Sequence, residues 1–406
     1  MAKLARPWGA EVHAPPGAKG AQSPQSARAQ GPRALRVLVV GGGIGGLCAA
    51  IALRGAGHAV DLVERNPAWD VYGVGIIQPG NALRALDALG LAREAVAAGH
   101  PIVGDSTWTA DGSQLIAAND WPPLVEGLPP GNGITRPRLH RILQTHTLAS
   151  GTDVRTGVTF ESIDERRDRV DVRFTDGQLR SYDLVVGADG LHSQVRRAVF
   201  GAELEARYTG EVCWRYNLPR IEGLDRIWVY LGETGTAGFV PLAGDLMYML
   251  TIEKPPDGAP VRLDRAGLAA TYRERLRQFG GPVADCAHLV VDDAEVVYRP
   301  VETILVARPW HRGRVVLIGD AAHATSPQCG QGAAQAIEDA IVLTEELAVD
   351  RPLKETFEAF TERRYERCRV IVEGSEAIGR WEQDHCYPID PSAVRHEVTM
   401  AAMAPI

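Results

Sequence analysis

The alternation of apolar and polar residues divides the chain into strands and helices. Positions 35–40 (LRVLVV) form an apolar, β-branched run that is typical of a strand buried in a parallel sheet. A glycine-rich turn at 41–46 leads into LCAAIALRGAG, which has helical composition and ends at a glycine. The run HAVDLVE, at 58–64, predicts a second strand. Strand, glycine turn, helix and strand within about 30 residues predict a βαβ unit.

The same patterns recur further along the chain. Helical spacing occurs at 81–99 and 138–148, and an alternating stretch at 158–176 leads through the turn TDGQ into another buried strand, YDLVVG. Later, GRVVLIGD predicts a buried strand, and residues 330–348 predict an amphipathic helix. Between about 200 and 300, short aromatic runs separated by Gly, Pro and Asp turns predict an antiparallel sheet layer. We therefore expect an α/β fold, in which a Rossmann-type domain carries an inserted antiparallel β-sheet domain.

Composition and charge exclude several classes of protein. The chain has 406 residues, 45% hydrophobic and 23% charged, which is ordinary for a globular protein of two or three domains. Its net charge of -8 argues against a nucleic acid as partner. Six cysteines without CxxC or Cys/His ligand spacing predict neither a metal site nor a disulfide framework, and we expect a cytoplasmic location. The longest uncharged apolar run, 37–53, is shorter than the roughly 20 residues of a membrane helix, so no membrane partner is expected.

Residues 1–34 differ from the rest of the chain. They contain 18 Ala, Pro or Gly residues and no hydrophobic periodicity, which predicts a disordered leader. Five basic residues against one acid, Glu11, make a transit peptide the alternative. Five prolines would interrupt an amphipathic helix and favour the plain leader.

The turn GGGIGG has GxGxxG spacing through Gly41, Gly43 and Gly46. In this pattern Gly41 makes the tight turn, Gly43 leaves room for a pyrophosphate, and Gly46 allows close packing of the helix, whose N-terminus faces the phosphates. Glu64 ends the next strand, close to the roughly 20-residue distance at which an acid meets a ribose hydroxyl. The alternatives are an ordinary glycine-rich turn and a solvated charge at Glu64. We predict a dinucleotide site, for which NAD and FAD both remain possible at this point.

Two further motifs, GADGLHSQVR at 187–196 and LIGDAAHATSPQCGQG at 317–332, follow in order. With them, the chain from about Val37 to about residue 375 resembles the class A flavoprotein monooxygenases, the FAD-dependent aromatic hydroxylases built like para-hydroxybenzoate hydroxylase. The resemblance implies a Rossmann-type FAD-binding domain and a separate substrate domain. The FAD-binding domain would comprise 35–105, 131–200 and 300–375, the substrate domain 106–130 and 201–299, and a C-terminal tail 376–406.

The resemblance also implies which residues bind the cofactors. The Gly-Asp motif, here Asp320, binds the ribityl and pyrophosphate groups of FAD, and the residues after Cys329 line the flavin ring. The Asp-Gly motif serves FAD and the incoming NADH or NADPH. Family members often carry Asn or Gly where this chain has Ala334. The expected cofactor-binding residues are Gly41, Gly43, Gly45, Gly46, Glu64, Arg65, Arg136, Val158, Asp189, Gly190, Arg196, Asp320, Gly330, Gln331, Gly332, Ala333 and Ala334.

The family's chemistry implies that NAD(P)H reduces FAD, that O2 forms a flavin C4a-hydroperoxide, and that one oxygen atom passes to an electron-rich ring carbon. No obligatory catalytic side chain is implied, and we interpret His323 and His192 as structural. We expect hydroxylation of a small aromatic or heteroaromatic substrate. Trp214 and Tyr216, which share one face of the strand 211–219, are expected to line the substrate pocket with Phe239 and Tyr248, the alternative being an ordinary sheet core. Pro327 stands where the family offers a carbonyl to the substrate.

Other functions remain as alternatives. One is an enzyme that epoxidises or rearranges a larger polycyclic substrate, and another is a flavin redox sensor without turnover. The presence of both the Asp-Gly and the Gly-Asp motif argues against the sensor, and the absence of WxWxIP argues against a halogenase. The protein is expected to be a monomer or a homodimer.

Overall fold

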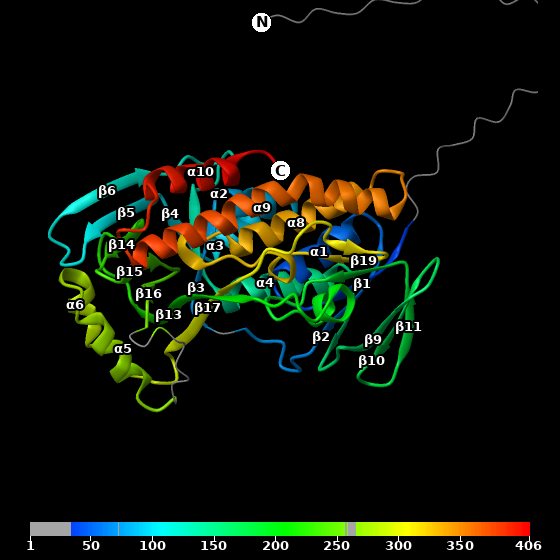
Figure 1. Cartoon of the computed structure of the whole chain (residues 1–406), viewed down its shortest axis with the longest axis horizontal. Helices are drawn as coiled ribbons and strands as arrows, with labels where there is room; N and C mark the ends of the chain where they lie inside the picture. The colour runs from blue at the N-terminus through cyan, green and yellow to red at the C-terminus, as the bar shows by residue number, and fades with distance from the viewer. Residues whose placement is uncertain (1–33, 72, 256–257, 259–264) are drawn as a thin grey trace, which may run out of the picture.

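A computed structural model describes residues 34–71, 73–255, 258 and 265–406. The predicted disordered leader lies outside these residues except for Ala34. Four sheets and the helices around them form two layered regions, with the sheet of β1 in one and the sheet of β13 in the other (Figure 1). No helix among the described residues is both long and apolar enough to cross a membrane.

The predicted βαβ unit forms the centre of a six-stranded sheet. Its order is β18-β19-β12-β1-β2-β8, and every neighbouring pair is parallel except β18 with β19. Residues 37–40 of β1 are buried because neighbouring strands flank them and helices cover the sheet. The strands are β1 (Arg36–Val40), β2 (Ala59–Glu64), β8 (Asp153–Thr156), β12 (Leu184–Gly187), β18 (His311–Arg312) and β19 (Val315–Leu317).

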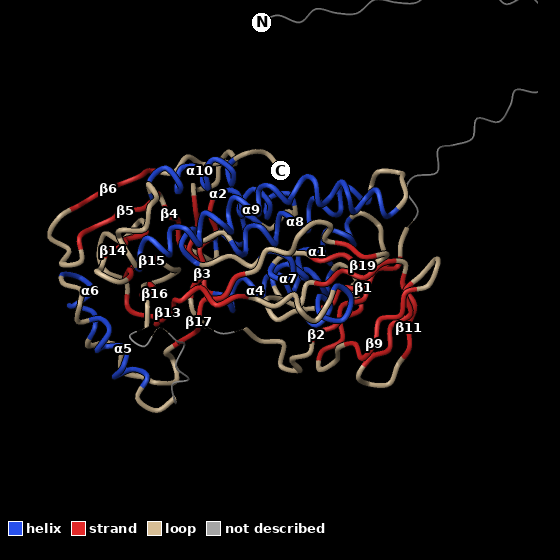
Figure 2. The backbone as a smooth tube through the Cα atoms, in the orientation of Figure 1, coloured by secondary structure: helices blue, strands red, loops and turns tan. Residues whose placement is uncertain are grey.

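Helices α1 (Ile44–Gly55) and α8 (Gly332–Leu347) pack against each other beside this sheet, and α4 (Arg136–Ala149) packs on α1. Figure 2 shows most of the helices gathered on one side of the molecule, with the three-stranded sheet β9-β10-β11 at the opposite end from α5 and α6. This region also contains α2 (Gly80–Ala88), α3 (Ala92–Ala97), α7 (Asp320–His323), β9 (Phe160–Glu165), β10 (Val170–Phe174) and β11 (Leu179–Tyr182).

The predicted antiparallel layer is a seven-stranded sheet of order β17-β13-β16-β15-β14-β5-β6. Strands β5 and β6 come from residues 104–120 and join it through parallel pairing of β5 with β14. Helices α5 (Leu268–Leu276) and α6 (Gly281–Ala287) cover its outer face. The strands are β5 (Gly104–Thr109), β6 (Leu115–Asp120), β13 (Arg207–Pro219), β14 (Ile227–Leu231), β15 (Gly235–Pro241), β16 (Leu246–Glu253) and β17 (Val297–Thr303).

A small sheet lies between the two regions. It consists of β3 (Gly75–Pro79), β7 (Gly131–Thr135) and β4 (His100–Ile102), in the order β3-β7-β4. The Pro241 carbonyl oxygen comes so close to this sheet that a Cβ added at Gly133 would lie 1.9 Å from it.

The C-terminal part of the chain differs from expectation. The long helix α9 (Leu353–Gln383) runs through the expected boundary at 375 without interruption, and α10 (Pro391–Met403) follows. Residues 376–406 therefore form the last turns of one helix and a second helix instead of a tail. Because α9 packs on α8 and also on β13 and β15, it joins the parallel sheet region to the antiparallel sheet.

Candidate active site

The first and second motifs meet at the N-terminus of α1. Gly41 has a φ of 109°, and a Cβ there would lie 2.4 Å from the carbonyl oxygen of Ala188. A Cβ at Gly46 would lie 1.9 Å from the carbonyl oxygen of Gly41. A Cβ at Gly43, in contrast, would meet nothing within 4 Å. Gly41 and Gly46 are therefore required by packing, whereas Gly43 faces open space, as a position that a phosphate approaches must.

The third motif, at 317–332, lies close to the N-terminus of α1, and Ala336 of α8 is in contact with both. A Cβ at Gly45 would lie 3.2 Å from the Ala336 side chain, and a Cβ at Gly319 would lie 3.0 Å from it. A Cβ at Gly332 would lie 4.0 Å from a carboxylate oxygen of Asp320. The N-termini of α1 and α8 thus converge with the Gly-Asp turn, and their free amides and dipoles favour an anionic ligand.

Glu64 lies beside the glycine turn at 41–46. One of its carboxylate oxygens accepts the Gly42 amide at 2.8 Å, and the other accepts the Asn66 amide at 2.7 Å. A carboxylate has further lone pairs, which remain for a ribose hydroxyl. The Val158 amide donates to the Glu64 carbonyl at 3.1 Å, so the strand expected at the adenine lies beside this acid. Arg65 is exposed.

Asp320 and Arg136 are oppositely charged side chains that interact electrostatically but form no hydrogen bond or ion pair with any described residue. The Asp320 carboxylate is exposed and forms no hydrogen bond with a described residue, yet the protein around it raises its pKa by desolvation. Asp320 is therefore accessible to a ligand although the surrounding protein disfavours its charge, and we refer to the space between Asp320, Arg136 and the facing sheet as the cleft. Arg136 is half-buried and close enough to interact with Asp320, and its buried Nε has no hydrogen-bond partner within the described part of the chain. Unpaired charges in such a place cost free energy unless a ligand supplies partners, and FAD, with hydroxyls and phosphates, fits this donor set.

A third unpaired charge comes from the antiparallel sheet. Arg215 on β13 is half-buried and forms no hydrogen bond or ion pair with a described residue. It interacts electrostatically with Arg136 and with Tyr248. Tyr248 is 4% exposed, and burial raises its pKa to about 12 even though Arg215 and Arg136 oppose the shift. The cleft between the two regions is therefore rich in positive charge. The sequence placed Arg215 on a strand face without assigning it a role.

Three of the four aromatic residues expected in the pocket lie elsewhere. Trp214 is 2% exposed, stacks on Tyr272 with ring centroids 5.3 Å apart, and donates its indole N–H to Glu253 at 3.0 Å. Tyr216 and Phe239 belong to the same core cluster, which packs against α5 and α6. The reason is the alternation of the strand, because Trp214 and Tyr216 face the helices while Cys213 and Arg215 face the cleft. Tyr248, paired with Asn217 in the ladder, is on the cleft face.

The Asp-Gly motif holds its own loop together. Asp189 accepts the Gln194 and Val195 amides at 2.7 and 3.0 Å and bonds Ser193, and desolvation raises its pKa. Gly190 has a φ of 78°. Arg196 is 1% exposed, and its three nitrogens donate to the carbonyls of Leu191, Leu204 and Ala321 at 2.7 to 2.8 Å. An arginine whose donors are bound in this way ties the loop to α7. Three of the five N–H donors of Arg196 are used in this way, so the side chain stabilises the loop, and its expected contact with NAD(P)H stays a prediction.

The loop before α8 is held from several sides. The Pro327 carbonyl accepts the Gly330 amide at 3.0 Å and closes a 3-10 turn, and Gly330 has a φ of 63°. The Gln331 side chain is 6% exposed and is held by Asn81, whose amide donates to it at 3.0 Å. Gly332 and Ala333 are half-buried at the start of α8, and Ala334 is buried in the core.

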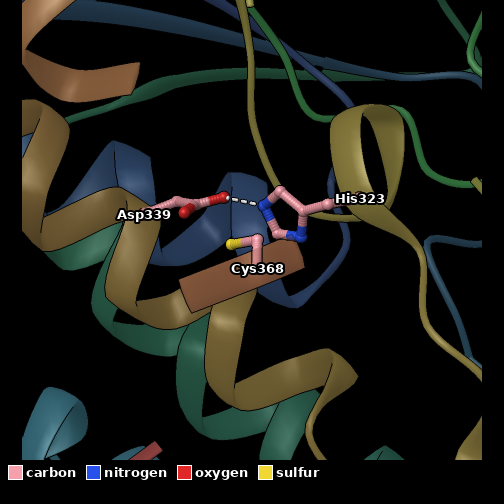
Figure 3. Close-up of side chains that lie close together, drawn as sticks. All are labelled: His323, Asp339 and Cys368. Atoms are coloured by element: carbon pink, nitrogen blue, oxygen red, sulfur yellow. Dashed lines mark hydrogen bonds and ion pairs between the residues drawn. The ribbon is translucent and has the colours of Figure 1, made fainter. Parts of the chain in front are cut away.

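His323, Asp339 and Cys368 form a buried cluster behind the Gly-Asp turn (Figure 3). Their potential ligand atoms all lie within 4.8 Å of one another. Asp339 accepts His323 Nε2 at 2.6 Å and the Gly319 amide at 2.7 Å, and Arg364 donates to its other oxygen at 2.7 Å. Although burial opposes it, Cys368 and Asp339 raise the pKa of His323 well above its ordinary value. Arg364, 3.7 Å from Cys368 Sγ, brings a positive charge to the cluster, and the structural role expected for His323 stays a prediction.

Comparison with known proteins identifies the family. Residues 34–356 match the family described as "FAD binding domain". The "Putative FAD-dependent monooxygenase YetM" of Bacillus subtilis is 35% identical over 350 residues, which cover 85% of this chain and 93% of that protein. The "2-heptyl-3-hydroxy-4(1H)-quinolone synthase" of Pseudomonas aeruginosa is 35% identical over 360 residues, 86% of this chain and 90% of that protein.

The fold agrees with these relatives. The crystal structure of Klebsiella pneumoniae HpxO complexed with FAD and uric acid superposes with a TM-score of 0.79 at 26% identity, over 91% of this chain and 97% of that one. The predicted α/β architecture with a separate antiparallel sheet is thereby confirmed. Converging motifs, unpaired cleft charges and extended similarity lead to one conclusion: the chain belongs to the FAD-binding monooxygenase family and is an FAD-dependent, class A type monooxygenase.

Proposed function

We propose that the enzyme hydroxylates a ring carbon of an aromatic or heteroaromatic substrate that carries an acidic or enolisable ring oxygen, and that Arg215 binds this oxygen. The observation that carries the proposal is the unpaired guanidinium of Arg215 on the cleft face of β13. A cation without a partner in a desolvated cleft gains more from an anionic ligand than a neutral one. An oxygen held there also donates electrons into the ring and makes the ring carbon reactive.

The relatives support this substrate class. One is named for a 3-hydroxy-4-quinolone, and the HpxO structure contains uric acid. Both are heteroaromatic rings with oxygen substituents. On the protein side, Asn217 on β13 and Tyr248 on β16 pair with each other and share the sheet face of Arg215, which would give the pocket two further polar groups for orienting a ring.

We infer that FAD binds where the motifs at 41–46, 187–196 and 317–332 come together. Gly43 would lie beneath the pyrophosphate, Glu64 would accept a ribose hydroxyl, and Asp320 and Arg136 would bind the central part of FAD. The N-terminus of α8 would face the flavin ring, where it would stabilise the negative charge of the reduced form. Bound FAD supplies the redox chemistry and the activation of O2, while the protein orients the substrate and excludes water.

A substrate screen with matched variants tests the proposal. Hydroxybenzoates, hydroxypyridine carboxylates, 4-quinolones and purines are assayed for stimulated NAD(P)H consumption, and products are checked by mass for the gain of one oxygen atom. For the substrate found, Arg215→Met should raise KM about tenfold or more, since a hydrogen bond to a charged group contributes about 1.5–3 kcal/mol. Arg215→Lys should restore part of the loss.

Arg277→Met is the control, because Arg277 is exposed at the C-terminal end of α5, which covers the opposite face of the same sheet. The proposal is wrong if Arg215→Met and Arg277→Met have the same KM, or if the only substrates are rings without an ionisable or enolisable oxygen.

A further inference from the structure

Two buried acids lie behind the loop at 327–331. Glu211 on β13 is 2% exposed, and Glu382 on α9 is 3% exposed. Among the described residues, the pair has one bonded cation, Arg395 on α10, whose Nη2 lies 2.7 Å from Glu382 Oε1. Two carboxylates against one guanidinium leave a negative charge in the interior without compensation, which is costly.

The other groups around the pair do not supply this charge. Tyr208 and Cys213 face Glu211 from β13, and Cys329 faces Glu382 from the loop. None of these side chains is cationic. The remaining contacts of Glu211 are with the neutral side chains of Gln328, Thr209 and Gln383.

Gln328 connects the pair to the loop. Its Nε2 donates to Glu211 Oε1 at 2.9 Å, and its carbonyl oxygen accepts Arg395 Nη1 at 3.5 Å. Gln328 Oε1 and Glu382 Oε2 are buried and have no hydrogen-bond partner among the residues that the structure describes. Both atoms are acceptors, so a proton on the acid pair supplies a donor that this cluster lacks.

Helix α9 is shaped to approach this cluster. A Cβ at Gly379 would lie 2.7 Å from Glu211 Oε2 and 2.9 Å from Gln328 Nε2. Glycine at this position lets the helix backbone pass close to both side chains, so the acids and Gln328 are enclosed by the helix on one side and by the strand on the other.

We propose that Glu211 and Glu382 share one proton at neutral pH and, through Gln328, hold the loop before α8 in the geometry that binds FAD. Both acids are positioning residues, since they act through Gln328. Burial, and then the charge of Glu382, raises the pKa of Glu211 to about 8. The folded state therefore retains a proton that the unfolded chain releases at about pH 4.5. Stability contributed by the pair declines as the pH rises toward 8, and the loop loosens once the proton leaves.

The test uses Glu211→Gln, which keeps the shape of the protonated acid and cannot ionise. Melting temperatures of the FAD-free protein and FAD dissociation constants, from quenching of flavin fluorescence, are measured from about pH 6 to about pH 9. For the wild type, we expect the dissociation constant to rise about threefold or more across this range and the melting temperature to fall. For Glu211→Gln both profiles should be flatter, and at about pH 9 the variant should melt about 2 °C or more above the wild type.

Glu373→Gln is the matched control, because Glu373 lies on the same helix but is exposed and ion-paired with Arg369. It should follow the wild-type profiles. Glu382→Gln tests the same idea independently and should also flatten both profiles. A wild-type FAD affinity that does not change with pH, or parallel profiles for the wild type and the glutamine variants, would overturn the proposal. Neither measurement involves a substrate, so the result is independent of the proposed hydroxylation.

Discussion

At the scale of single residues, the cleft is built from charges that the protein leaves unpaired. Arg136, Arg215 and Asp320 form no hydrogen bond with a described residue, whereas Asp189 and Arg196, from motifs of equal prominence in the sequence, are held by several hydrogen bonds inside the protein. A motif predicts that a residue matters, but only the three-dimensional contacts distinguish a residue that binds a ligand from one that holds a loop.

Replacing Asp320 by Ala should separate binding from stability. We expect FAD affinity to fall about tenfold to a hundredfold, because a hydrogen bond to a charged group is lost. The FAD-free variant should melt no lower than the wild type at neutral pH, since the raised pKa of Asp320 means that its ionised form is desolvated and unfavourable. Flavin fluorescence titration and thermal unfolding measure the two effects, with Asp350→Ala as an exposed control. An Asp320→Ala protein that retains wild-type FAD affinity would contradict the assignment.

At the scale of elements, the sequence predicted what depends on local pattern. Strands β1, β2, β12 and β19 and helices α1 and α8 were identified because buried parallel strands and amphipathic helices have distinct periodicities. The two faces of β13 were also separated correctly by alternation. Which face meets the cleft was predicted wrongly, because the answer depends on α5 and α6, which cover the aromatic face from about 50 residues further along the chain. Alternation distinguishes faces and does not state what packs on them.

Helix α9 is bonded to α8 through one buried arginine, Arg364. Arg364 is fully buried and donates to Glu338 at 2.6 Å and to Asp339 at 2.7 Å, both also fully buried. Replacing it by Met removes the cation that the two buried carboxylates share and leaves only Arg84 and Arg367 beside Glu338 and His323 beside Asp339, so we expect a loss of about 3 kcal/mol in the free energy of unfolding. The neighbouring Arg363, about one-third exposed and paired with Glu345 and Glu346, is the matched control, and Arg363→Met should cost less than about 1 kcal/mol.

Urea unfolding at neutral and acidic pH measures both variants. Although burial opposes it, His323 and Arg364 hold the pKa of Asp339 below its ordinary value. The stabilisation is therefore present at neutral pH and is lost as the pH falls through the folded-state pKa. The difference in the free energy of unfolding between the wild type and Arg364→Met should therefore become smaller at acidic pH. If Arg364→Met and Arg363→Met lower the free energy of unfolding by the same amount, the prediction that the buried ion pairs of Arg364 contribute more than the partly exposed ones of Arg363 is wrong.

At the scale of the whole molecule, the C-terminal helices are part of the site. No role could be predicted for residues beyond 375, because this region contacts residues more than 100 positions away, such as Arg207 and Glu211. In the structure, Arg84 and Arg367 donate to the carbonyls of Met403 and Ala404 and fasten the end of α10 to α2 and α9. Long-range pairing of this kind has no local signal.

A chain that ends at residue 388 should therefore lose both stability and FAD affinity. Removing α10 exposes Ile371, which packs on Val398 and Ala402, and deprives Glu382 of Arg395. The truncation removes this apolar contact and also Arg395, the one cation among the described residues that is bonded to Glu382. Together, the two losses should lower the free energy of unfolding by about 3 kcal/mol or more. Because Arg395 also bonds the carbonyl of Gln328, FAD should bind more weakly even at temperatures at which the shortened protein is folded.

Met400→Ser, at an exposed position of α10, is the control and should match the wild type. If the shortened protein binds FAD as tightly as the full chain, α10 covers the molecule without supporting the loop, and the site ends at α9.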